Sequence, residues 1–369
     1  MVRPPHPNRL GDISVLYVAA MGRALQARGI DPERLYRPFR ITRELLQTPD
    51  ARITIPRYMR LGHEAITLTG DPAIGLAFGQ ALRFTDMGLS GLTALCAPTL
   101  GDVLETLIRF ERLTNYNSRG RSRWVAEGPG GPEAHFYSIA PYNRYNCFVV
   151  DTVLSGWLGL LDWLAPPNTK SAAVTRVELE YPPHGYAQAL ESFFQAPLHF
   201  DGDHNRLCLS KAFAHTPNPL AEPATWQAMQ GRCEAELRRQ ELGWSVVDRV
   251  SEALTPRLRG QVPEMARIAA EIGTTEWGLR RRLAQQGLTY RGVVDRTRRE
   301  LAMDYVRNTA LSFSAISELL GFSHPAGFHR AFRRWHGEAP GEWRQRYSST
   351  LSSTSSSSSQ SGTSSRSSR

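Results

Sequence analysis

Two hydrophobic periods divide the first 213 residues into expected helices and strands. Apolar residues recur with helical spacing in five segments, 15–28, 55–69, 99–113, 148–164 and 186–194. Apolar and polar residues alternate, as in strands, over 174–181 and within 198–209. Two more strand-like segments, 121–127 and 134–139, flank Gly128-Pro-Gly-Gly-Pro132 and predict a β-hairpin. This order of elements favours an α+β fold over a parallel α/β fold.

A helical pattern occurs twice in the last third of the chain. One copy runs over 265–283 and the other over 313–332, and each has a short apolar helix, a glycine and a second, arginine-rich helix. The glycines, Gly273 and Gly321, are 48 residues apart. A glycine at this position permits the positive φ that ends a helix sharply. The repeat therefore predicts two helix-turn-helix units.

Capping and spacing give these units further detail. Thr275 is expected to cap the second helix of the first unit, and Ser323 or His324 with Pro325 to begin its counterpart. Between the units, 290–308 predicts one long connecting helix, whose buried stripe is Val294, Thr297, Leu301 and Tyr305. Its arginines, Arg296, Arg298, Arg299 and Arg307, are expected to decorate the exposed side.

Proline-rich and serine-rich stretches indicate the domain boundaries. Three prolines lie within 214–226, a stretch with little apolar periodicity, so a linker is expected over 214–244. The predicted division is an α+β domain over 1–213, the linker, an all-α domain over 245–347 and a tail over 348–369. Fourteen of the 22 tail residues are serine, which predicts disorder because so little apolar surface can be buried.

Charge is concentrated in the second domain. The whole chain carries a formal net charge of +9, with 41% hydrophobic and 21% charged residues, as is ordinary for a folded protein. Residues 1–230 contribute +1, whereas 231–347 contribute +6, with 20 arginines against 14 acidic side chains. A basic domain favours a polyanionic partner, and charge alone leaves a nonspecific nucleic-acid binder as an alternative.

Several other classes are disfavoured by missing patterns. Residues 1–8 lack the apolar core of a signal peptide, and the apolar stretch 148–165 contains two aspartates and is short for a membrane span. We therefore expect a cytoplasmic protein with no membrane partner. The four cysteines are widely spaced with no CxxC, which fits neither a disulfide framework nor a zinc site. With no HExxH, GxSxG or P-loop motif, we expect no enzyme, cofactor or metal.

Family-like segments cover nearly the whole chain. In the second domain they are Arg298-Arg-Glu-Leu-Ala302, Ile316-Ser-Glu-Leu-Leu-Gly-Phe322, Phe328-His-Arg-Ala-Phe-Arg-Arg-Trp-His-Gly337 and Pro340-Gly-Glu-Trp-Arg344. With these, residues from about 245 to 347 resemble the DNA-binding domain of the AraC/XylS family of bacterial transcription regulators. In the first domain, Gly70-Asp-Pro-Ala-Ile-Gly-Leu76, Met87-Gly-Leu-Ser-Gly91 and Ala97-Pro-Thr-Leu-Gly101 resemble the arabinose-binding-like effector domain of a subgroup that controls ornithine use and virulence.

The resemblance implies specific DNA-contacting residues. In the first unit these are Trp277, Arg280 and Arg281, and in the second they are Ala326, His329 and Arg330, with Arg333 beside them. An arginine can make two hydrogen bonds to guanine, and the alternative is a phosphate clamp that reads no sequence. Gly278 departs from the usual pattern and is expected to weaken the first recognition helix. Pro325 and Ala326 stand where longer polar side chains often reach bases, so the second unit is expected to make fewer direct base contacts.

The resemblance also implies double-stranded DNA and RNA polymerase as partners, and activation as the commoner outcome. The first domain is expected to bind a small-molecule effector, with Tyr142, Tyr145 and Trp157 as candidate contacts, although aromatic residues usually fill cores. The alternative is a regulator without an effector, whose first domain only forms a homodimer. The sequence leaves this choice open.

Overall fold

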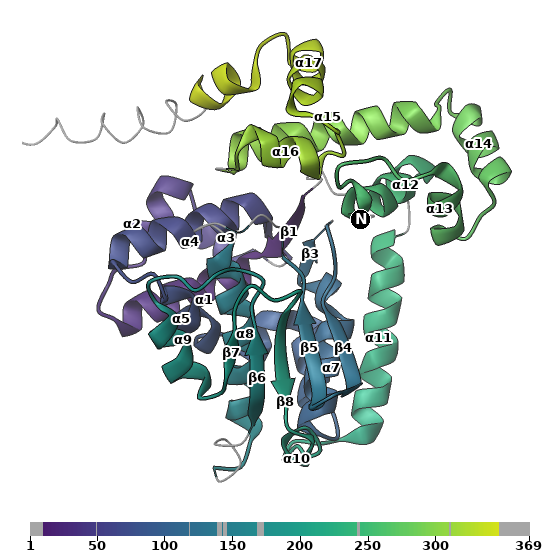
Figure 1. Ribbon diagram of the computed structural model, residues 1–369. Coiled ribbons are helices and arrows are strands. Elements are labelled where there is room, and N and C mark those ends of the chain that lie inside the picture. The colour runs from purple at the N-terminus through teal and green to yellow at the C-terminus, as the bar shows by residue number, and fades with distance from the viewer. Residues whose placement is uncertain are drawn as a thin grey trace, which may run out of the picture.

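The structure, a computed structural model, describes residues 10–48, 50–117, 119–138, 142, 146–167, 173–241, 244–309 and 311–346. Figure 1 shows a mixed body of helices and strands, with a helical domain lying across one of its ends. The predicted disorder of 348–369 and the candidate Tyr145 fall outside the described residues.

Two sheets organise the N-terminal domain. One has the antiparallel order β2-β1-β3, formed by Arg52–Thr54, Gly11–Ser14 and Asn115–Asn117. The other has the order β4-β5-β8-β6-β7, formed by Arg123–Gly128, Gly131–Phe136, Asn205–Leu209, Val174–Glu178 and Leu198–His199. Its pairs are antiparallel except β6 with β7. The α+β class and the β4–β5 hairpin are confirmed.

Helices cover these sheets. The longer ones are α1 (Val15–Ala27), α4 (Ile55–Thr69), α7 (Leu100–Arg109), α8 (Cys147–Leu164) and α11 (Pro223–Glu241). The shorter ones are α2 (Glu33–Tyr36), η1 (Arg37–Phe39), α3 (Arg43–Gln47), α5 (Ile74–Gln80), η2 (Phe84–Met87), α6 (Gly88–Leu95), η3 (Glu111–Leu113), α9 (Ala187–Phe194) and α10 (Lys211–Ala214). The sequence predicts α7 to residue 113, but the α-helix ends at Arg109 and η3 follows.

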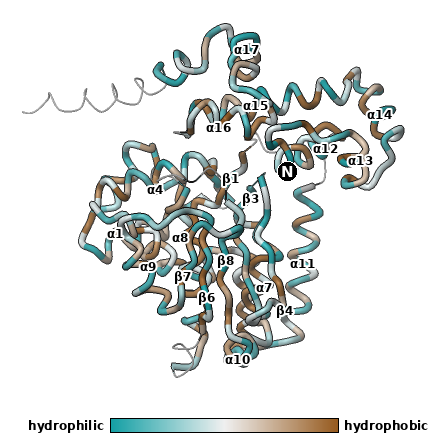
Figure 2. The backbone as a smooth tube through the Cα atoms, viewed as in Figure 1, coloured by the Kyte–Doolittle hydropathy of each residue, from teal (hydrophilic) through white to brown (hydrophobic). Residues whose placement is uncertain are grey.

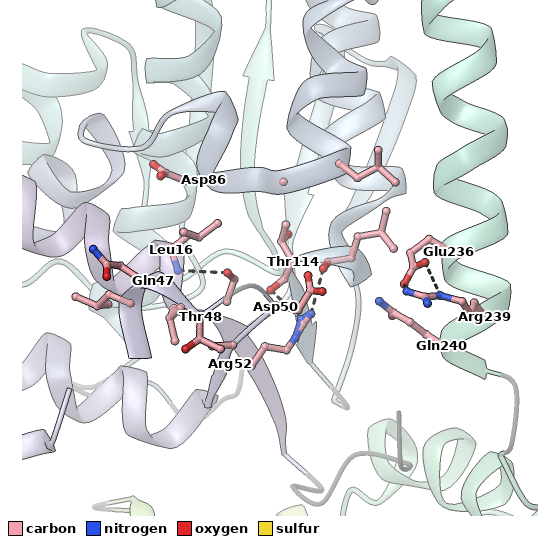
Figure 3. A pocket seen from close by; sticks show the side chains of 17 residues that line it. Leu16, Gln47, Thr48, Asp50, Arg52, Asp86, Thr114, Glu236, Arg239 and Gln240 are labelled. Atoms are coloured by element: carbon pink, nitrogen blue, oxygen red, sulfur yellow. Dashed lines mark hydrogen bonds and ion pairs between the residues drawn. The ribbon is translucent and has the colours of Figure 1, made fainter. Parts of the chain in front are cut away.

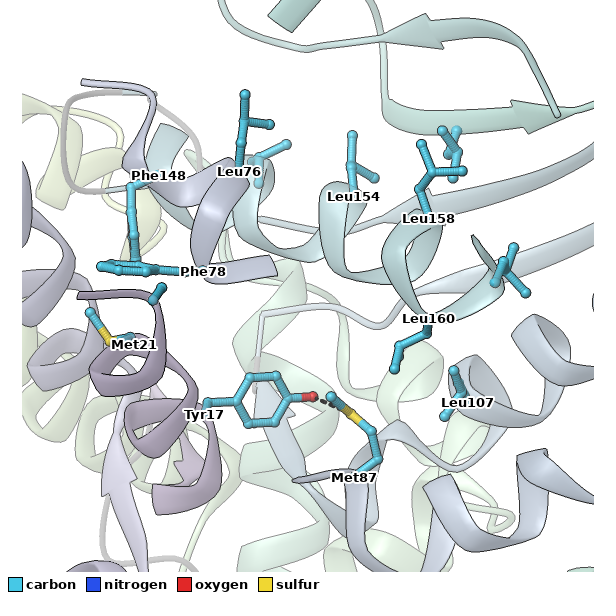
Figure 4. Packing of buried hydrophobic residues seen from close by; sticks show 14 of the residues in the cluster. Tyr17, Met21, Leu76, Phe78, Met87, Leu107, Phe148, Leu154, Leu158 and Leu160 are labelled. Carbon is cyan, nitrogen blue, oxygen red and sulfur yellow. Dashed lines mark hydrogen bonds between the residues drawn. The ribbon is translucent and has the colours of Figure 1, made fainter. Parts of the chain in front are cut away.

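The core of this domain is built around α8. Gly79 of α5 lets the two helices approach closely, because a Cβ there would lie 2.0 Å from Ser155 Oγ. Figure 4 shows Phe148, Leu154 and Leu158 of α8 among the packed apolar side chains. By length and composition α8 could cross a membrane, but 67% of it is buried inside the protein, as expected for the core helix of a folded domain.

Helix α11 occupies most of the segment predicted as a linker. It packs against α6 and α7 of the N-terminal domain along one narrow face. Trp226 Nε1 donates to Thr106 Oγ1 at 3.1 Å, and the buried Cys233 Sγ lies 3.2 Å from Thr93 Oγ1. Figure 2 shows mixed colouring on α11, unlike the hydrophobic interior around β6 and β8. Because its apolar stripe is sparse, its periodicity is weak in the sequence.

The C-terminal domain consists of two helix-turn-helix units that share one helix. Unit 1 comprises α12 (Val246–Leu254), α13 (Met265–Glu271), α14 (Glu276–Gln285) and the first half of α15 (Tyr290–Asn308). Unit 2 comprises the second half of α15, α16 (Phe313–Leu319) and α17 (Pro325–His336). The predicted connecting helix and its buried stripe, Val294, Thr297, Leu301 and Tyr305, are confirmed.

The segment between α12 and α13, which belongs to unit 1 along the chain, also packs against unit 2. The 3-10 helix η5 (Thr255–Arg257) follows α12 of unit 1, yet Leu258 directly after it is buried in the core of unit 2. The Gly260 N–H donates to the Glu318 carbonyl at 2.8 Å. Leu10, just before β1, is also buried in the unit 2 core. The N-terminal domain is therefore in direct contact with the helical domain.

Candidate nucleic-acid interface

The turn of unit 1 forms as the sequence predicts. Gly273 has a φ of +71°, and the Thr274 N–H donates to the Ala269 carbonyl at 2.9 Å, which closes the end of α13. The Thr275 hydroxyl caps α14 by accepting the Gly278 N–H at 3.1 Å. Leu279 is fully buried, so the opposite face of α14 is directed outward.

Three predicted DNA contacts lie on that outward face. Trp277 is 66% exposed, which is unusual for so large an apolar ring. The Arg281 guanidinium lies over this ring, 4.9 Å from its centre, so the two side chains form a cation–π pair. Arg280 instead donates to Glu276 Oε1 at 2.7 Å. The two arginines thus differ: one is stacked on a tryptophan and the other is neutralised by a carboxylate.

Unit 2 presents a different surface. Gly321 has a φ of +70°, and α17 begins at Pro325 after His324, whose side chain makes no capping hydrogen bond. Phe328 and Phe332 are fully buried. The predicted contacts on this helix, Ala326, His329, Arg330 and Arg333, are all exposed.

The ring of His329 is held at the edge of the unit 2 core. Its centre lies 5.5 Å from that of Phe313 and 5.6 Å from that of Phe328, in T-shaped contacts. The side chains of Arg330 and Arg333, in contrast, make no hydrogen bond or ion pair among the described residues. The long, unpaired cations of this face are therefore its two arginines, while its first turn carries only the short Ala326.

Not every arginine of the basic domain faces solvent. Arg298, expected on the exposed side of α15, is half-buried and donates from Nε to the Leu320 carbonyl at 2.7 Å and from Nη2 to the Gly321 carbonyl. It also stacks over Phe322 at 4.2 Å, and burial lowers its pKa. Arg298 therefore closes the C-terminal end of α16, a role that spacing along α15 does not reveal.

The effector candidates of the N-terminal domain are held by local contacts. The Tyr142 hydroxyl donates to the Glu180 carboxylate and accepts from Asn205 Nδ2 at 2.6 Å. Trp157 packs edge-on against Phe136, with ring centres 6.2 Å apart. Neither side chain lines the cavities described below, and Tyr145 lies outside the described residues.

One cavity of the N-terminal domain presents both signs of charge. It has a volume of about 710 Å³ and is bounded by α1, the α3–β2 turn, α6 and α11. Figure 3 shows Glu236, Arg239 and Gln240 of α11 across the cavity from Gln47 and Thr48. Its charged lining side chains are Asp50, Arg52, Asp86, Glu236 and Arg239.

Two further cavities flank strand β3. A cavity of about 50 Å³ is lined mainly by apolar and aromatic residues, including Tyr17 and Tyr58, together with Asn115 and Asn117. A cleft of about 630 Å³ lies between the domains, with Asn117, Gly120 and Arg121 on one side and α12 and Glu271 on the other. Asn117 therefore lines both cavities.

One carboxyl group of α8, that of Asp151, is buried. The hydroxyls of Tyr181 and Tyr186 donate to the two oxygens of Asp151, the second at 2.8 Å. Burial raises the pKa of Asp151 to about 7, although both hydrogen bonds act in the opposite direction. This group titrates near neutral pH but lies away from the exposed faces of α14 and α17.

Comparison with known proteins matches both domains. Residues 29–218 match the family model described as the arabinose-binding domain of AraC transcription regulators, and 268–346 match a helix-turn-helix domain.

Two curated relatives and one solved structure extend the comparison. The ornithine utilization regulator of Pseudomonas aeruginosa is 28% identical, covering 90% of this chain and 96% of the relative. The transcriptional regulator VqsM of the same species is 29% identical over 74% of this chain and 84% of the relative. The crystal structure of the transcriptional regulator CdpR, also from Pseudomonas aeruginosa, has a TM-score of 0.44 at 22% identity and covers 89% of this chain and 98% of that one.

Proposed function

Since the chain belongs to the AraC family of transcription regulators, with an arabinose-binding domain and a helix-turn-helix domain, we propose that it reads duplex DNA with two helices, α14 and α17. The observation that carries this proposal is the pair of exposed faces on these helices, joined by one continuous helix. Helix α15 has 19 residues and is thus about 28 Å long. That length suits two helices lying in major grooves about 34 Å apart.

In unit 1, Arg281 is the proposed base reader. Its stacking on Trp277 limits the positions of the guanidinium before DNA arrives, so less side-chain entropy is lost on binding. A bidentate contact to guanine is worth about 1–3 kcal/mol of discrimination. Trp277 itself offers an apolar face to thymine methyl groups or sugars. Arg280 must leave Glu276 before it can contact DNA, so its role is secondary.

In unit 2, Arg330 is the proposed base reader and Arg333 a phosphate contact. Ala326 is too short to hydrogen-bond a base edge and can only touch a thymine methyl. His329 is partly occupied by its contacts with Phe313 and Phe328. Unit 2 is therefore proposed to read fewer base pairs than unit 1.

The N-terminal domain is proposed to bind a small zwitterion. Both signs of charge line the 710 Å³ cavity, where Glu236 and Arg239 form an ion pair with each other, and a ligand carrying an ammonium and a carboxylate can replace that pair. The name of the ornithine utilization regulator makes an amino acid the first ligand to try. We further propose that the regulator acts in the cytoplasm as an activator that contacts RNA polymerase, and that it forms a homodimer.

Selection from a random duplex DNA pool, at near-physiological salt, tests the DNA-binding proposal. The expected site contains two short motifs about one helical turn apart. Arg281→Ala should relax one motif and Arg330→Ala the other, whereas Arg346→Ala, outside both helices, should change neither. Binding without enrichment that disappears as salt rises would leave only a phosphate binder.

Thermal unfolding with and without L-ornithine and other amino acids tests the effector proposal. A ligand at 100 times its Kd should stabilise the folded protein by about 2.7 kcal/mol. Asp50→Asn is expected to weaken this stabilisation without changing the unliganded Tm. If no amino acid raises the Tm while site selection succeeds, the alternative of a regulator controlled only through dimerisation is favoured.

A further inference from the structure

One arginine of the N-terminal domain is completely buried inside the helical domain. Arg119 follows strand β3 and is 1% exposed. Its Nη1 donates to the Thr255 carbonyl at 2.6 Å and to the Leu319 carbonyl at 3.0 Å. Its Nη2 donates to the Leu258 carbonyl at 3.2 Å. Among the described residues, no carboxylate forms an ion pair with this guanidinium, whose partners are the three carbonyls.

The three carbonyls come from both helix-turn-helix units. Thr255 follows α12 of unit 1, Leu319 is the last residue of α16 in unit 2, and Leu258 lies on the segment that joins them. Carbonyls at a helix C-terminus lack intrahelical partners and carry partial negative charge, which a planar guanidinium can satisfy. Arg119 therefore lies where the N-terminal domain, unit 1 and unit 2 meet.

Burial makes this contact different from its neighbours. A charged group removed from water is costly unless its hydrogen bonds are made, so breaking them leaves an unsatisfied cation and removes the guanidinium from three carbonyls, of which, in the described part of the chain, only that of Thr255 also accepts a backbone N–H, from Leu258. Arg112 is also largely buried, and its Nη2 lies 3.6 Å from the Glu252 carboxylate. Two further charged contacts between the domains lie nearer solvent: Arg121 donates to Glu252 at 3.2 Å, and Arg259 donates to the Tyr137 hydroxyl at 2.8 Å. Exposed pairs of this kind contribute little.

We infer that Arg119 is a positioning residue for DNA recognition: it fixes unit 1 relative to unit 2, and so makes binding depend on the spacing between the two half-sites. Helix α15 connects the units along one side, and Arg119 ties the α12–η5 end to the α16 end on the other. These hydrogen bonds are a second connection besides α15, and they restrict bending and twisting between the units. The inference rests on the proposed reading of DNA by both α14 and α17.

The same residue links the units to the N-terminal cavities. The Arg119 N–H donates to Asn117 Oδ1 at 2.9 Å, and Asn117 lines both cavities that flank β3. The contact between the units therefore adjoins these two cavities, whereas the 710 Å³ cavity proposed for the effector contains neither Asn117 nor Arg119 in its lining.

The first test uses full-length Arg119→Met, which keeps much of the side-chain length and removes the donors. Binding is measured to the selected operator and to operators with one or two base pairs inserted between the half-sites. For the wild type, insertion should weaken binding at least about tenfold, because only one unit can then be well placed. For Arg119→Met, the ratio of the affinity for the selected operator to the affinity for the operator with inserted base pairs should fall below about threefold. Arg121→Ala, the matched control two residues away, should keep the wild-type ratio.

Two outcomes overturn the inference. An unchanged ratio would mean that α15 alone sets the spacing, and equal weakening on all operators would mean a role in stability only. If Arg119→Met does not fold, Arg119→Lys takes its place, with the same expected direction.

Hydrogen exchange of the free proteins tests the contact without DNA. Amides of the segment from Leu258 to Gln261 should exchange at least about tenfold faster in the variant, with no change in α8. No change at these amides would refute the tie between the units. Because this arm needs no operator, its result stands even if the wild-type protein selects no DNA site.

Discussion

Gly273 and Gly321 end the first helices of the two units with nearly the same backbone geometry, at φ values of +71° and +70°. Their surroundings differ. A Cβ added to Gly273 would meet nothing within 4 Å, whereas one added to Gly321 would lie 2.5 Å from the Gln261 carbonyl oxygen and 3.2 Å from Leu258 Cδ2. Alanine at these two positions therefore separates backbone strain from crowding.

The expected costs follow from that difference. Alanine in the left-handed region costs about 1–2 kcal/mol, so Gly273→Ala should lower the opening free energy of its unit by this amount only. Gly321→Ala should lose this amount and about 1–3 kcal/mol more, because the neighbouring atom is backbone and the segment joining the units must shift. Its total should therefore be about 2–5 kcal/mol.

Hydrogen exchange measured by mass spectrometry gives the local opening free energy of each unit. Gly273→Ala should lower it in α13 and α14 alone, and Gly321→Ala should lower it more, in α16, α17 and the segment after η5. Equal losses in the two variants, or a larger loss for Gly273→Ala, would refute the reasoning from Cβ contacts.

Three other changes have defined outcomes. Burial raises the pKa of Asp151 to about 7, so between about pH 4 and pH 7 the folded protein retains a proton that the unfolded chain has lost, and the contribution of this group to stability falls by about 1.4 kcal/mol for each unit by which the pH rises. In urea unfolding, Asp151→Asn should lack this fall, and parallel pH profiles would contradict the assignment. Arg298→Met should destabilise unit 2 by about 1–3 kcal/mol in the exchange assay by removing hydrogen bonds to two carbonyls, while the exposed-site control Arg299→Met stays within about 0.5 kcal/mol. Glu276→Gln should release Arg280, raise DNA affinity up to about fivefold and steepen the salt dependence by about one phosphate contact; an unchanged slope in a salt titration would argue against it.

Local signals predict the helical domain well. The stripe on α15 is buried at all four predicted positions, because the helix packs against both units along one face. Gly273 and Gly321 take the positive φ expected of them, and Thr275 caps α14. Each of these features depends on a few neighbouring residues, which is why the sequence is sufficient to find them.

Features that depend on distant chain segments are not visible in the sequence. Nothing in the sequence distinguishes Arg119 from other arginines, and the pattern over 290–308 predicts Arg298 on an exposed face. Only the folded structure brings each to the carbonyls at the end of α16. Strands β1, β2 and β3 have only three or four residues each, too few to show alternation of apolar and polar positions. They form a sheet because distant segments of the chain pair with one another. The charged cavity beside α11 combines segments more than 200 residues apart, so composition gives no sign of it.

Guanine-N7 methylation interference on the selected operator tests most directly whether both recognition helices read DNA. N7 lies in the major groove, where α14 and α17 are proposed to bind. The account predicts two clusters of interfering guanines on one face of the duplex, about 10 base pairs apart, with Arg281→Ala abolishing one cluster and Arg330→Ala the other. A single cluster, unaffected by Arg330→Ala, would contradict the claim that unit 2 reads DNA alongside unit 1.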